Sequence, residues 1–138
     1  MNADLTDVTR RYVEGLGRRK TAIARVRLIP DGTGVFLVND RPWDHYFPTI
    51  DMQKAASDPF HSTGTWGQFD VSVHVSGGGV HSQADAVKLG VARALVKHDE
   101  RFRKSLRDTD MLTRDPREKE RKKPGLKRAR RAPQWQKR

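Results

Sequence analysis

The alternation of apolar and polar positions along the chain predicts two β-strands. In residues 21–28, TAIARVRL, every second position is Ala, Val or Leu, and Arg25 and Arg27 fall on the opposite side. A period of two is typical of a strand with one face on a core. Residues 69–76, FDVSVHVS, repeat the pattern more strongly, with Phe69 and three valines on one side and four polar residues on the other.

Shorter elements are predicted between these two strands. Residues 30–34, PDGTG, have turn chemistry, and residues 35–38, VFLV, follow as a short strand expected to form a hairpin with residues 21–28. A short helix is predicted from Trp43 to Phe47, with Pro42 near its first position. A second is predicted from Thr49 to Ala56 with Thr49 as its cap, and residues 57–67 are expected to be a loop.

A helical period follows the second strand and predicts a helix from a Ser82 cap to about His98. Its buried face is expected to consist of Ala84, Val87, Val91 and Leu95. Residues 101–107 add a helical turn or two, and the chain beyond Asp115 is too polar and too charged to pack alone. The fold class is therefore α+β, with an antiparallel sheet of about four strands and helices against one face.

Composition restricts the classes of protein further. The chain has 138 residues and no cysteine, which fits one domain with an appendage and excludes disulfides and thiol catalysis. No apolar stretch approaches the roughly 20 residues that span a bilayer. The acidic N-terminus lacks the apolar region of a secretory signal, so we expect no export and no membrane partner.

Positive charge is concentrated at the end of the chain. Residues 1–100 contain 12 Lys or Arg and 12 Asp or Glu, whereas residues 101–138 contain 16 and 5, so the net charge of +11 lies in the last quarter. A neutral body with a cationic extension indicates a polyanionic partner. Nucleic acid suits it better than lipid, because Pro124, Gly125 and Pro133 would interrupt a membrane-surface helix.

Residues 121–138 hold nine Lys or Arg and no acidic residue. Arginine makes bidentate contacts with phosphate, and Trp135 can stack on a base or sugar. These arginine clusters favour folded RNA, and the alternative is a solvated, non-specific tail or a localisation signal. The predicted RNA contacts here are Arg121, Lys122, Lys123, Lys127, Arg128, Arg130, Arg131 and Trp135.

Two glycine-containing motifs are partly similar in sequence to phosphate-binding loops. Residues 15–21, GLGRRKT, lack the Walker spacing and precede a strand, so we interpret them as a cationic turn, with a solvated turn and strand face as the alternative. The predicted RNA-facing cations of the body are Arg18, Arg19, Lys20, Arg25 and Arg27. Residues 77–79, GGG, precede a predicted helix and either bind phosphate through free amides or form a turn that needs positive φ or close packing.

Catalytic chemistry has little support. The five histidines lack metal-ligand spacing, no Lys and Asp pair near the glycines is placed to organise Mg²⁺, and no nucleophile has a recognisable partner. Asp115, Glu118 and Glu120 are expected to form local ion pairs. We therefore expect no enzyme activity, no cofactor, no metal and no small-molecule substrate.

Four stretches together resemble one family. They are GLGRRKTAIARVRLIPDGTG at 15–34, VNDRPWDHYFP at 38–48, SGGGVHSQADAVKLGVARAL at 76–95 and LTRDPREKERKKPGLKRARRAPQWQKR at 112–138. From Tyr12 onward the chain is similar, in order and without a large insertion, to the bacterial small-subunit ribosomal protein numbered nine. It departs from the family at Pro124, Trp135 and Gln136 in the tail, and at residues 81–82 and Asp85 after the glycines.

The resemblance implies a structural RNA-binding protein of the small ribosomal subunit. It implies a left-handed split βαβ domain over residues 12–108 and a long extended basic C-terminal tail (109–138). Residues 1–11 match nothing in the family, and their polarity predicts a disordered N-terminus. The implied partners are small-subunit ribosomal RNA in the head, neighbouring head proteins, and peptidyl-site tRNA contacted by Lys137 and Arg138. The implied location is the cytoplasmic ribosome, and the alternative function is non-specific binding of nucleic acid.

Overall fold

A five-stranded sheet forms the centre of the protein. The computed structural model describes residues 11–137, so the expectations for residues 1–10 and for Arg138 lie outside the described part of the chain. The strands run in the order β1-β2-β5-β3-β4, and β3 and β5 are parallel whereas the other pairs are antiparallel. They are β1 (Val13–Arg19), β2 (Ala22–Ile29), β3 (Phe36–Val38), β4 (Arg41–Pro42) and β5 (Asp70–Ser76).

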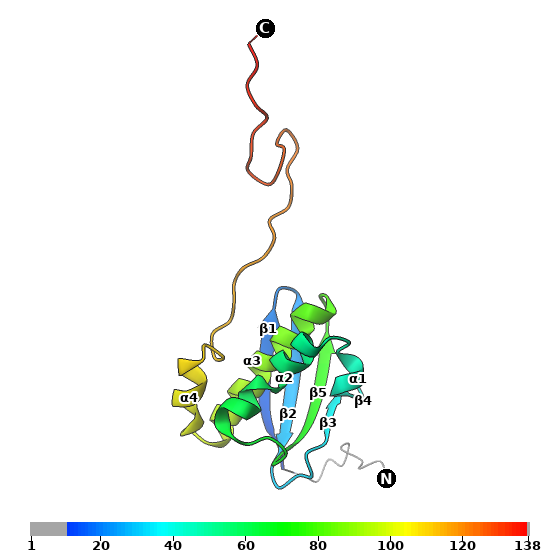
Figure 1. The fold of residues 1–138 in the computed structure, drawn as a ribbon, viewed down its shortest axis with the longest axis vertical. Helices are drawn as coiled ribbons and strands as arrows, with labels where there is room; N and C mark the ends of the chain where they lie inside the picture. Colours follow the sequence, from blue (N-terminus) through cyan, green and yellow to red (C-terminus); the bar gives the residue numbers. More distant parts are fainter. Residues whose placement is uncertain (1–10, 138) are drawn as a thin grey trace.

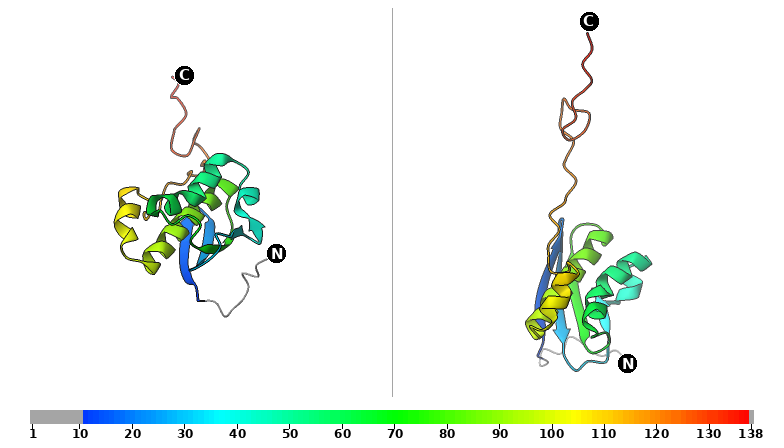
Figure 2. Two further views of the ribbon diagram at one scale, coloured as in Figure 1. Left: turned by 60° about the horizontal axis from the view of Figure 1, so that its bottom comes forward. Right: turned by 60° about the vertical axis from the view of Figure 1, so that its left-hand side comes forward.

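Helices cover one face of this sheet and leave the other open (Figures 1 and 2). The helices are α1 (Trp43–Tyr46), α2 (Ile50–Thr63), α3 (Val80–His98) and α4 (Phe102–Asp108). The four residues predicted for the buried face of α3 are completely buried, as are Ala22, Ala24, Val26 and Leu28 of β2. The α+β fold class is therefore confirmed, but the sheet has five strands instead of about four, and it is mixed instead of antiparallel because β3 runs parallel to β5.

Two of the five strands, β1 and β4, match none of the strand ranges predicted from the sequence. Strand β1 lies where the sequence pattern indicates a cationic turn. It forms an antiparallel hairpin with β2, and only Lys20 and Thr21 lie between the paired ends Arg19 and Ala22. The glycines of β1 explain its place against α3. A Cβ added at Gly17 would lie 1.8 Å from the carbonyl oxygen of Ala86, so only a glycine strand can approach the helix this closely.

The expected hairpin between residues 21–28 and 35–38 is wrong. Strand β5 lies between β2 and β3, and β3 pairs with β5 in parallel. Residues 30–34 form a loop that is held by Asp70 and not a hairpin turn. The buried carboxylate of Asp70 accepts hydrogen bonds from the backbone amides of Thr33, Gly34 and Val35 at 2.8–3.0 Å. Asp70 is only 2 % exposed, although the alternation placed it on the polar face.

Two helix boundaries also differ from prediction. Helix α2 continues to Thr63 through Pro59, where a loop was expected, and ends at Gly64 in the left-handed conformation with φ +67°. Helix α3 begins at Val80 after Gly79, so Ser82 is a buried residue inside the helix and not its cap. The helix predicted over residues 101–107 is confirmed as α4, and within residues 109–137 there is no further helix or strand.

Side chains of α3 occupy part of the outer edge of β1. Arg93 Nη1 donates to the carbonyl oxygen of Leu16 at 2.9 Å, and Lys97 Nζ donates to that of Glu14 at 3.1 Å. Outward-facing carbonyls of an edge strand otherwise need water or another strand as donor. The interaction therefore fixes the hairpin to the helix at the sheet border.

None of the helices within residues 11–137 is both long enough and apolar enough to cross a membrane.

Candidate nucleic-acid interface

The open face of the sheet gathers cations from β1 and β2. Even-numbered residues of β1 and odd-numbered residues of β2 point away from the helices, which exposes Arg18, Arg25 and Arg27. Lys20 occupies the exposed hairpin turn with φ +52°. Four of the five predicted RNA-facing cations of the body are therefore exposed on this face or at its end, where phosphate groups could reach them.

Polar and aromatic side chains lie beside Arg25 and Arg27, although they are distant from them in sequence. The register pairs Arg25 with His74 and Arg27 with Ser72, and the four residues line a hollow of about 200 Å³. The guanidinium of Arg27 lies 4.8 Å from the ring centroid of Tyr12, a cation–π geometry. Only the pairing register, which a single sequence does not reveal, brings these groups together.

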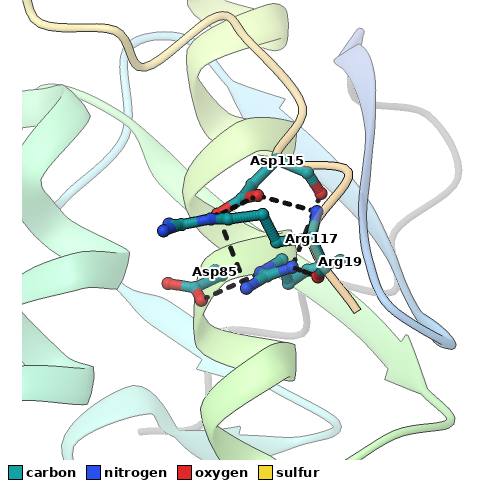
Figure 3. Close-up of polar contacts among 4 residues, drawn as sticks. All are labelled: Arg19, Asp85, Asp115 and Arg117. Atoms are coloured by element: carbon teal, nitrogen blue, oxygen red, sulfur yellow. Dashed lines mark hydrogen bonds and ion pairs between the residues drawn. The ribbon is translucent and has the colours of Figure 1, made fainter. Parts of the chain in front are cut away.

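Arg19, the fifth predicted cation of the body, lies on the other side of β1. Its side chain is 15 % exposed and faces α3, where its Nε lies 3.6 Å from Asp85 Oδ2. Its Nη2 lies 3.5 Å from Asp115 Oδ2, and its Nη1 donates to the carbonyl oxygens of Asp115, at 3.5 Å, and of Arg117. Figure 3 shows this arrangement, which joins the hairpin to the chain after α4.

Asp115 and Arg117 form a second, local pair within that chain. The carboxylate of Asp115 accepts from Arg117 Nε at 3.0 Å, from Arg117 Nη2 at 2.8 Å and from the Arg117 backbone amide at 2.9 Å. These side-chain and backbone hydrogen bonds from Arg117 hold the pKa of Asp115 well below its ordinary value. The carboxylate therefore stays ionised, and the predicted local ion pair at this residue is confirmed.

The backbone after α4 runs away from the sheet and helices (Figure 1). All the predicted tail contacts among residues 121–137 are exposed except Lys123, which is half-buried, and Trp135 is 80 % exposed. Glu120 pairs with Lys123 and, at 2.9 Å, with Arg130 Nε. This carboxylate closes a bend in which the Lys127 amide donates to the Arg131 carbonyl at 2.7 Å.

Backbone conformation and packing explain why residues 77 and 78 are glycines. Gly77 and Gly78 have φ of +75° and +62°, and a Cβ at Gly77 would lie 2.6 Å from the carbonyl oxygen of Thr21. Both observations support the interpretation of this motif as a turn that needs positive φ or close backbone packing, the alternative to phosphate binding. Residues 11–137 also contain no group of three His, Asp or Glu side chains placed to hold a metal ion.

The fold and the charge distribution define a class of small, strongly basic α+β proteins with cations gathered on one sheet face and along the C-terminal segment. Residues 17–138 match the family model described as Ribosomal protein S9/S16. The chain therefore belongs to this ribosomal protein family, a structural and non-enzymatic component of the small ribosomal subunit. The resemblance in the sequence and the expectation that the chain is not an enzyme are thereby confirmed.

Proposed function

We propose that the body binds ribosomal RNA in the head of the small subunit and that the C-terminal tail reaches tRNA in the peptidyl site. One observation carries this proposal: beyond Glu120 the chain has nine cations and no acidic residue, in a member of a ribosomal protein family. Within residues 11–137, the side chains of Lys122, Lys127, Arg128, Arg131 and Lys137 pair with no acidic group. They are therefore available for phosphate.

The proposed chemistry is phosphate neutralisation by positioned cations, with little reading of base sequence. On the body the contacts are Arg18, Lys20, Arg25 and Arg27. In the tail they are Arg121, Lys122, Lys123, Lys127, Arg128, Arg130 and Arg131, with Trp135 stacking on a base or sugar. The sequence also predicts that Arg19 contacts ribosomal RNA, but its guanidinium is already paired with the carboxylates of Asp85 and Asp115.

The proposal divides the chain into a folded part, residues 12–108, and a tail, residues 109–138, that is extended when RNA surrounds it. Like charge along residues 121–138 resists collapse, and RNA phosphates would remove that repulsion. We also propose that the crossover from β3 to β5 is the left-handed one of a split βαβ domain. Neighbouring head proteins and a cytoplasmic ribosome complete the proposed setting.

The first test concerns the end of the tail. Replacement of Lys137 and Arg138 by glutamine should leave the protein folded and the subunits assembled, while tRNA binds less tightly in the peptidyl site. The reason is that two charges near the anticodon stem-loop are lost without a change in chain length. Binding of labelled tRNA to purified subunits measures the effect.

Replacement of Gln134 and Gln136 by alanine is the matched control, because it changes the same segment without changing charge. Equal tRNA affinity in both sets of subunits would contradict the tRNA role. A competition between ribosomal RNA and random duplex DNA at about 150 mM salt, near physiological ionic strength, tests the broader proposal. Equal affinity for the two would favour the alternative, a non-specific basic protein.

A further inference from the structure

We propose that Arg19 is an anchor that fixes the start of the C-terminal tail to the body and so sets the direction in which the tail leaves. This inference goes beyond RNA binding, and its first test requires no RNA. It assigns Arg19 a role as a positioning residue, distinct from the phosphate contacts proposed for its neighbours Arg18 and Lys20.

The alternation of β1 places Arg19 on the helix side of the sheet. Gly15 and Gly17 point in the same direction and are buried against α3, so the next residue of that side, Arg19, extends over the first turns of the helix. There its guanidinium meets Asp85 of α3. Arg18 points to the open face, and this separates the two arginines although they are adjacent in sequence.

Every nitrogen of the guanidinium lies near a protein oxygen, Nη1 in hydrogen bonds and Nε and Nη2 in ion pairs. Nε faces Asp85, Nη2 faces the carboxylate of Asp115, and Nη1 faces the carbonyl oxygens of Asp115 and Arg117. An arginine with a 15 % exposed side chain and two carboxylates around it presents little positive potential to a phosphate. The planar guanidinium group suits the joining of β1, α3 and the chain after α4, since it reaches several oxygens in a fixed geometry.

The tail side of the contact is itself held in shape. Pro116 lies between the two residues that supply the carbonyl acceptors, and its ring fixes φ and removes a donor. The bidentate pair of Asp115 with Arg117 closes the same three residues into one unit. Arg19 therefore binds a preformed turn, at a low cost in chain entropy.

A second attachment lies a few residues earlier. Met111 is 8 % exposed, its amide donates to the Leu106 carbonyl at 3.0 Å, and Ser62 Oγ lies 3.7 Å from its sulfur. Leu112 packs partly against the same core. One attachment would leave the chain free to rotate, whereas two attachments, at 111–112 and 115–117, fix a direction. Beyond Arg117 the tail leaves the body (Figure 1).

The experiment uses the full chain, which has no native cysteine. Cysteines introduced at exposed Lys54 on α2 and exposed Lys119 after the anchor carry spin labels, and pulsed electron paramagnetic resonance gives the distance distribution between them. We expect one narrow distribution in the parent protein and a clearly broader one after Arg19→Ala. Arg18→Ala is the matched control, because it removes the same charge from the adjacent residue and should leave the distribution narrow.

A distribution that is as narrow after Arg19→Ala as after Arg18→Ala would overturn the proposal. Asp115→Asn provides a second variant that does not touch the sheet, in case Arg19→Ala disturbs folding. It should broaden the distribution as well, and the double variant should be no broader than Arg19→Ala alone, because both changes break one contact. If the broadening in the double variant equalled the sum of the broadening in the two single variants, the anchor proposal would also be contradicted.

Binding to a ribosomal RNA fragment separates the anchor from a phosphate contact. Arg18→Ala should reduce the slope of log affinity against log salt by about 0.7–0.9. Arg19→Ala should leave this slope unchanged and weaken binding roughly 2- to 10-fold, because a loosened tail must be ordered on binding. A reduced slope would show that Arg19 itself contacts phosphate. Absence of RNA binding would contradict the proposed function and leave the distance test of the anchor intact.

Discussion

At the scale of single residues, Asp70 shows how one buried charge organises a loop. Its Oδ1 accepts hydrogen bonds from three successive backbone amides, Thr33 to Val35, and from the Thr33 hydroxyl at 3.3 Å. Buried amides without acceptors destabilise a fold, so this carboxylate satisfies a segment that has no strand partner there. The sequence places Asp70 on a polar face, because alternation alone cannot identify a loop that folds over that position.

Removal of this carboxylate should therefore destabilise the protein strongly. We expect Asp70→Ala to lower the free energy of unfolding by about 3 kcal/mol, since three backbone amides lose their buried, charged acceptor. Asp70→Asn keeps one acceptor oxygen and should cost less. Urea unfolding measures both changes.

Asp108→Asn is the control for Asp70, because Asp108 is exposed at the end of α4. It should change stability by no more than about 0.5 kcal/mol. An effect of Asp70→Ala as small as this would contradict the role of the carboxylate.

At the scale of elements, the sequence predicts those with clear periodicity and fails where the period is interrupted. Strands β2 and β5 and helix α3 are predictable because each buries one regular face, whereas α4 buries only Leu106. Strand β1 could not be predicted in this way, because Gly15 and Gly17 carry no side chain that marks a buried face. The end of α2 was misplaced at Pro59, which usually interrupts a helix, and the pairing of β3 depends on contacts distant in sequence.

The close approach of β1 to α3 gives a test at this scale. Gly17→Ala would place a Cβ 1.8 Å from the Ala86 carbonyl oxygen, and backbone cannot move aside as a flexible side chain can. We expect a loss of about 2–3 kcal/mol or more in the free energy of unfolding, as overpacked sites show. Thermal or urea unfolding measures this loss.

Gly79→Ala is the control for Gly17, since a Cβ there has nothing within 4 Å and φ is negative. Because Ala is less favourable than Gly at a helix N-cap, this change should cost about 1 kcal/mol at most, which is less than the loss expected for Gly17→Ala. Equal losses in the two variants would contradict the packing account of β1.

At the scale of the whole molecule, charge and fold are divided between two parts of the chain. The first hundred residues carry equal numbers of acids and bases, and the excess lies beyond them. The sequence predicts this division and the exposed cations of Arg25, Arg27 and the tail. It could not predict that Arg19 lies on the helix side, because that depends on the register of β1, nor that Glu120 closes a bend with Lys123 and Arg130.

This division predicts how RNA affinity depends on salt. Replacement of Lys127, Arg128 and Arg131 by glutamine should reduce the slope of log affinity against log salt by about 2–3, since each lost phosphate contact contributes about 0.7–0.9. Titration of a ribosomal RNA fragment at several salt concentrations measures the slope. Replacement of Ala129 and Ala132 by glutamine is the neutral control, and an unchanged slope in the cation variant would argue against phosphate contacts in the tail.

The covered border of β1 has a consequence for newly made protein that has not met RNA. At β1 the carbonyls of Glu14 and Leu16 already have donors from α3, and the opposite border is β4, a strand of two residues that ends in Pro42. These contacts and the short β4 reduce the number of free backbone groups to which a foreign strand could add. A chain awaiting incorporation into its particle therefore offers strand-exchange aggregation fewer starting points than a sheet with two long uncovered edges would.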